Sequence, residues 1–108
     1  GCGWPTGVGA RETRRMLTHI VLFDVDTPEN AEEVVRRLTE MAPKIDVVES
    51  LEVGRDVIGS DRSWQIGLIV RLADRDALDT YATHPDHVAV LEFIRSVVTR
   101  SAAVDFLS

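Results

Sequence analysis

The chain has 108 residues, of which 44% are apolar and 28% charged, and its formal net charge is −6. This length favours a single domain with a modest core. Surfaces that bind nucleic acid are usually basic, so the acidic balance predicts no nucleic-acid partner. No apolar run approaches the roughly 18 residues that a membrane-spanning helix needs, so we expect no membrane contact.

The chain has one cysteine, Cys2, near its beginning. A single cysteine cannot build a disulfide framework, and no Cys/His spacing typical of a zinc site is present. Residues 1–16 also lack the apolar stretch of a secretory signal. We therefore expect a cytoplasmic protein.

Residues 1–15 differ in composition from the rest of the chain, because they are rich in glycine and arginine and show no apolar period. We interpret them as a flexible tail, an extended start or a remnant of expression. The folded domain is then expected to span 16–108, and deletion of the tail should leave its fold intact.

The segment 17–25, LTHIVLFDV, predicts a strand, since it is rich in β-branched and aromatic residues and has no glycine or proline. Its alternation places His19 and Phe23 on one face and Ile20 and Leu22 on the other. Both faces carry large apolar groups, so both are expected to be covered.

A helix is predicted to follow, starting after Thr27 and ending before Pro43. Thr27 is a favourable N-cap and Pro28 suits the first helical position. Apolar residues recur at helical spacing and form one buried stripe. The stripe consists of Ala31, Val34, Val35, Leu38, Met41 and Ala42.

Two further strands are predicted at 47–57 and 64–72, joined by the turn cluster 58–63. The second of them alternates strictly, with Ile66 on its apolar face and Ile69 on the opposite face. A helix over 74–83 comes next, Pro85 interrupts it, and another helix runs over about 86–98. The closing RSAAVDFL predicts a last strand.

The predicted order is β-α-β-β-α-β, with the second helix broken at Pro85. This α+β pattern is typical of the ferredoxin-like fold, in which helices cover one face of a four-stranded antiparallel sheet. The other face would carry Ile20, Leu22 and Ile69, and nothing in the chain is left to cover it. Two-fold pairing buries such a patch twice, so the pattern predicts a homodimer through the open sheet face.

The stretch TYATHPDHVAV, residues 80–90, holds two of the three histidines. Tyr81 and His87 fall on the apolar faces of consecutive helical pieces, and His19 lies on the strand face that it shares with Phe23. These three side chains are therefore predicted to line one pocket between the sheet and the helices. His84 precedes the first-turn proline and is expected to cap or orient that helix.

A functional interpretation makes His87 a general base and Tyr81 a hydrogen-bond donor to a developing oxyanion or enolate. The pair would suit proton abstraction next to a carbonyl group or an aldol-type cyclisation. The competing interpretation places the same side chains in a filled core, each with one hydrogen bond. Spacing alone leaves both open.

A metal site is not expected. His84 and His87 are three residues apart, but Pro85 disturbs the helical geometry between them, and no carboxylate with clear ligand spacing joins them.

Three stretches together resemble the stress-responsive dimeric α/β-barrel domain, the Dabb family: HIVLF at 19–23, YATHPDH at 81–87 and VDF at 104–106. The resemblance extends over about 16–107. It implies a ferredoxin-like subunit, a homodimer whose two sheets form a barrel, and no cofactor. One branch of this family is a cofactor-free polyketide cyclase, and Tyr81 and His87 match its catalytic pair. His19 matches another histidine of its pocket.

The chain also departs from that branch. Ile66 stands where the cyclase has a third-strand histidine, and Asp24 stands where many relatives have lysine. We therefore expect a pocket for a small, mostly apolar or aromatic ligand, with the activity unassigned. A cyclase-like lyase or isomerase and a dimeric-barrel monooxygenase are the alternatives. Besides the catalytic pair, the predicted pocket residues are His19, His84, Phe23 and Ile66.

Overall fold

The computed structural model describes residues 15–108. Of the predicted tail, residues 1–14, which include Cys2, lie outside the described residues, and only Arg15 is described. Arg15 donates a hydrogen bond from its guanidinium to the carbonyl of Leu107 at 3.1 Å.

The observed elements follow the predicted order. They are β1 (Leu17–Val25), α2 (Pro28–Met41), the short 3-10 helix η2 (Ala42–Lys44), β2 (Ser50–Arg55), β3 (Ile66–Leu72), α3 (Arg75–Thr83), α4 (Pro85–Val97) and β4 (Val98–Leu107). The four strands form one sheet in the order β2-β3-β1-β4, and all neighbours are antiparallel. The predicted ferredoxin-like fold is confirmed.

The second and third strands along the chain, β2 and β3, are shorter than predicted. The strand expected over 47–57 is β2 at Ser50–Arg55, because the backbone first makes a turn in which the amide of Val48 donates to Ile45. At the other end the Asp56 carboxylate accepts from the amides of Ile58 and Gly59, which turns the chain away from the sheet.

Side chains cap the three α-helices where the sequence provides them. The Thr27 hydroxyl accepts from the amide of Asn30, and the Asp74 carboxylate accepts from the amide of Ala77. His84 ends α3 and begins α4, and its Nδ1 accepts from the amide of Asp86 at 3.1 Å. The cap predicted at His84 is therefore present, and it lies at the junction of α3 and α4.

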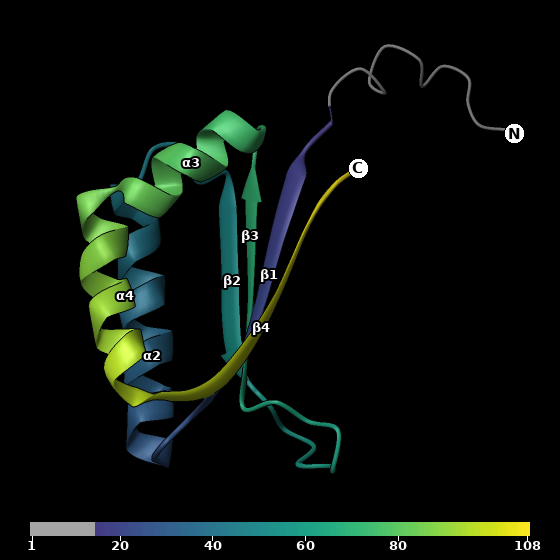
Figure 1. Ribbon diagram of the computed structural model, residues 1–108, viewed down its shortest axis with the longest axis vertical. Coiled ribbons are helices and arrows are strands. Elements are labelled where there is room, and N and C mark those ends of the chain that lie inside the picture. Colours follow the sequence, from purple (N-terminus) through teal and green to yellow (C-terminus); the bar gives the residue numbers. More distant parts are fainter. Residues whose placement is uncertain (1–14) are drawn as a thin grey trace, which may run out of the picture.

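Figure 1 shows the helices on one side of the sheet and an uncovered face on the other. Side chains that point from the sheet toward the helices form the core, with Val70 and Leu72 fully buried. On the uncovered face Val104 is 51% exposed and Phe106 43%. Ile20, Leu22 and Ile69 are half-buried there. The predicted open apolar face is present.

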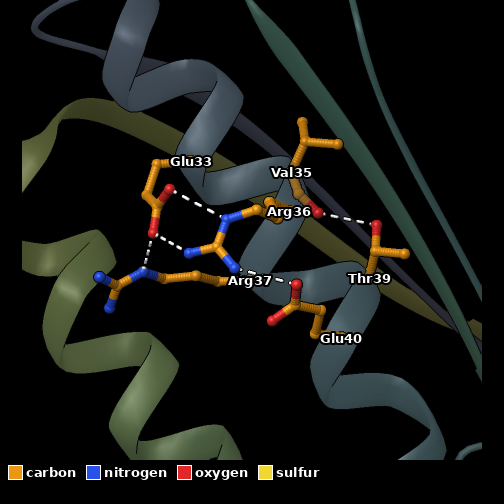
Figure 2. Close-up of polar contacts among 6 residues, drawn as sticks. All are labelled: Glu33, Val35, Arg36, Arg37, Thr39 and Glu40. Atoms are coloured by element: carbon orange, nitrogen blue, oxygen red, sulfur yellow. Dashed lines mark hydrogen bonds and ion pairs between the residues drawn. The ribbon is translucent and has the colours of Figure 1, made fainter.

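The outer surface of α2 carries a chain of ion pairs (Figure 2). Glu33 accepts from Arg36 and Arg37, and Arg36 also reaches Glu40 at 2.9 Å. Hydrogen bonds from Arg36 and Arg37 lower the pKa of Glu33 to about 2. The guanidinium of Arg37 also lies over the ring of Phe93 at 4.0 Å, which connects α2 to α4.

Candidate functional site

Three aromatic rings from three elements meet between the sheet and the helices. Tyr81 of α3 lies between His19 of β1 and His87 of α4. Its ring centroid is 6.2 Å from that of His19 and 4.3 Å from that of His87. The structure therefore brings together the three side chains that the sequence predicts at one place.

The Tyr81 hydroxyl is buried, and within residues 15–108 it has no hydrogen-bond partner. The side chain is only 1% exposed, and burial raises its pKa to about 12. The hydroxyl therefore keeps its proton at neutral pH. An unpaired buried hydroxyl costs free energy, and such a group calls for an explanation.

The ring of His87 is oriented by α3. Its Nδ1 lies 3.1 Å from the carbonyl oxygen of Ala82, and because a carbonyl only accepts, Nδ1 carries the proton. Burial lowers the pKa of His87, although the bond to Ala82 works in the opposite direction. The neutral ring then has its lone pair at Nε2, which is the atom able to accept a proton.

His19 has a partner that sequence reasoning missed. Its Nδ1 lies 2.5 Å from a carboxylate oxygen of Asp105, the residue opposite it in the pairing of β1 with β4. The carboxylate orients the imidazole and directs Nε2 away from β4. The closing VDF contains Asp105, but only the strand register shows that this acid lies opposite His19.

The other predicted pocket residues lie elsewhere. Phe23 and Ile66 face each other across β1 and β3, and both are buried in the core. Four residues of β1, roughly 13 Å, separate Phe23 from His19. His84 is occupied by its cap at the junction of α3 and α4. Phe23 and Ile66 thus support the core, and the structure does not place them beside the three rings.

A cavity of about 400 Å³ adjoins the His19–Asp105 pair. Its walls are mainly apolar, and two charged side chains are among the residues that line it. The lining residues are Leu17, Arg75, Leu78, Asp105, Phe106 and Leu107. Leu78 lies one helical turn before Tyr81, so α3 contributes to both the cavity and the ring cluster.

Within residues 15–108, no group of three or more His, Cys, Asp or Glu side chains is arranged to hold a metal ion. Among the helices described there, none is long and apolar enough to cross a membrane.

Residues 17–108 match the family model of the stress responsive A/B barrel domain, Dabb. The chain belongs to the Dabb family. This confirms the resemblance inferred from the sequence, and the match covers every helix and strand described above. A search of curated proteins finds no match for this chain.

Solved structures agree with this assignment. A dimeric ferredoxin-like protein of unknown function from Thermobifida fusca is 26% identical, with a TM-score of 0.79, and the match covers 87% of this chain and 92% of that one. A dimeric protein of unknown function with a ferredoxin-like fold, from Bacteroides fragilis, is 31% identical, with a TM-score of 0.72, over 84% of this Dabb chain and 94% of that one. A hydroxynitrile lyase from Passiflora edulis shares the fold at 8% identity, with a TM-score of 0.78, over 88% and 94% of the two chains.

Proposed function

We propose that this Dabb protein is a homodimer that binds a small, mostly apolar ligand bearing a carbonyl or hydroxyl oxygen, beside His19, Tyr81 and His87. The buried Tyr81 hydroxyl, which has no partner in the described chain, carries the proposal. A ligand oxygen at this point would give the hydroxyl the acceptor that it lacks.

The surroundings support an apolar ligand with few polar groups. The adjoining cavity is lined mainly by leucine and phenylalanine side chains, and its volume is within the usual range for sites that bind small molecules. The unprotonated Nε2 of neutral His87 can accept a hydrogen bond from a ligand hydroxyl.

Two observations support the homodimer. The similar ferredoxin-like proteins from Thermobifida fusca and Bacteroides fragilis are described as dimeric. The sheet face that carries Ile20, Leu22 and Ile69 is apolar and has no cover within residues 15–108. The cytoplasmic location expected from the sequence stays a prediction.

Catalysis without a cofactor is the second candidate function. The protonation states of Tyr81 and His87 favour it. Burial keeps Tyr81 protonated and His87 neutral near pH 7, which are the states that a hydrogen-bond donor and a general base require. The base would remove a proton next to a ligand carbonyl, and the tyrosine would stabilise the resulting enolate. The missing third-strand histidine, replaced by the buried Ile66, argues against identity with the cyclase reaction.

Tyr81→Phe tests the proposal. Removing an unpaired buried hydroxyl should raise the free energy of unfolding of the ligand-free protein by about 1 kcal/mol, since its desolvation cost disappears. The same variant should bind hydroxylated aromatic ketones about tenfold more weakly in calorimetric titrations. Thr80→Ala, which removes an exposed hydroxyl from the same helix and does not touch the cavity, is the control.

A destabilised Tyr81→Phe variant with unchanged ligand binding would show that the hydroxyl is an ordinary core group. If the protein is also an enzyme, His87→Ala should remove turnover while the dimer remains folded. Unchanged turnover in that variant would exclude His87 as the base.

A further inference from the structure

The uncovered sheet face contains a hollow that residues 15–108 leave unfilled. Its volume is about 580 Å³, and its floor includes Gly54 of β2 and Gly67 of β3, which pair with each other. Leu22, Ile69 and Trp64 line it as well. We call this concavity the glycine hollow.

Nothing in the described chain requires glycine at these two positions. A Cβ atom added to Gly54 would meet no atom within 4 Å, and one added to Gly67 would meet only Leu22 Cδ2, at the ordinary distance of 3.9 Å. Neither glycine has the positive φ that would exclude other residues. Glycine inside a strand weakens it and often marks a place where another chain or a ligand approaches closely.

The loop between β2 and β3 carries the most exposed large apolar residues of the described chain. Val57 is 91% exposed and Ile58 77%. The Asp56 carboxylate accepts from the amides of Ile58 and Gly59, and Gly59 adopts a φ of +70°, so the turn is held in a defined shape. We call residues 57–58 the loop tip.

Figure 1 shows this loop extending beyond the ends of β2 and β3 and away from the helices. The loop tip remains exposed, so it does not fill the hollow of its own chain. A second copy is the partner that would offer a matching hollow.

If the sheets of two copies close into one barrel, the positions of the two β2–β3 loops follow from the strand order. β2 and β4 are the edges of the sheet, and a two-fold axis parallel to the strands places β4 of one copy beside β2 of the other. The two strands then run in opposite directions, so they can pair and both edges disappear. Rotation about that axis keeps both β2–β3 loops at the same end of the barrel.

We propose that the two copies exchange loop tips, with Val57 and Ile58 of each copy inserted into the glycine hollow of the other. This inference rests on the homodimer proposed above and adds a second contact to the packing of the sheet faces. It explains both the exposed loop tip and the two glycines, at which an added Cβ atom would meet no close contact within residues 15–108.

Photo-cross-linking tests the contact directly. Ile58 is replaced by the photoreactive residue benzoylphenylalanine, and the variant is mixed with isotope-labelled unmodified chain before irradiation. We expect cross-links between chains to peptides that contain Leu22 or Gly67. A native dimer whose cross-links fall elsewhere, or only within one chain, would overturn the exchange and leave the homodimer standing. A monomeric native protein would overturn both.

Gly54→Val provides a second, independent test. A Cβ atom at position 54 meets no atom of the described chain within 4 Å, and a valine there would occupy the hollow, so the variant should fold normally and its dimer should dissociate with a Kd about tenfold higher. Ser50→Val, at the far end of β2 and outside the hollow, is the matched control. The double variant Val57→Ser with Ile58→Ser should weaken the dimer similarly, whereas Arg62→Ser should not. Equal dimer stability in all four variants would contradict the exchange.

Discussion

The two faces of the sheet carry similar apolar side chains in different surroundings. Leu17 and Phe23 of β1 point toward the helices and are 3% and 7% exposed. Ile20 and Leu22 of the same strand point the other way and are only half-buried. The apolar residues on both faces of β1 therefore predict that both faces are covered. Within the described chain, the helices cover one face, and the other face stays open.

The largest expected effect comes from placing a charge on the covered face. Val70→Asp would bury a carboxylate among core side chains with no partner, which costs more than a small domain of this kind can lose. We expect no cooperative thermal unfolding transition in circular dichroism. Ile69→Asp, the next residue on the opposite face, is the control and should retain the native spectrum. Equal loss of structure in both variants would remove the distinction between the faces.

Leu22→Asp should act on assembly and leave the fold of the subunit intact. In the proposed dimer the new charge would lie in a desolvated interface, so association should weaken by several kcal/mol. Sedimentation velocity at micromolar concentration should show a monomer whose circular dichroism spectrum is close to that of the native protein. A variant that remains dimeric would mean that the open face is not the interface.

Acid should lower the stability of the fold through His87, which lies on the helix-covered side of the sheet. Its pKa in the folded protein is lowered by burial, so the unfolded chain binds this proton more readily than the folded one. The contribution of neutral His87 is present above the ordinary pKa of 6.5 and is lost as the pH falls below it. The fall in Tm between pH 7.5 and pH 5.5 should therefore be smaller in His87→Gln. An identical fall in both proteins would show that His87 is not desolvated.

The smallest effect on thermal stability is expected when the ion pairs on the outer surface of α2 are removed. Arg36→Ala removes contacts to Glu33 and Glu40 that are open to solvent, and such pairs contribute little at physiological salt. Its Tm should stay within experimental error of the native value at 150 mM salt. Arg37→Ala should lower the Tm more, because Arg37 also packs on Phe93. The reverse order would show that the surface network stabilises the fold more than packing does.

Most of the fold could be predicted because local signals and apolar periodicity agree. Thr27, Asp74 and Pro85 mark helix starts, and the alternation within β1 matches its observed bounds. The ends of β2 could not be predicted, since they depend on hydrogen bonds made by Asp56 and on a turn after Ile45.

The site was predicted in part, for a similar reason. Helical spacing places Tyr81 and His87 on inward faces, so their meeting with His19 follows from the fold. Asp105 depends on the register between β1 and β4, which connects residues 86 positions apart in the sequence. Ile66 matched a family position, but its contacts place it in the core with Phe23.

Sedimentation equilibrium of the unmodified protein tests most directly whether a second copy covers the sheet face that residues 15–108 leave open. One chain has a mass of 12.0 kDa, so we expect a species of twice that mass at low micromolar concentration. A stable species at the mass of one chain would contradict it.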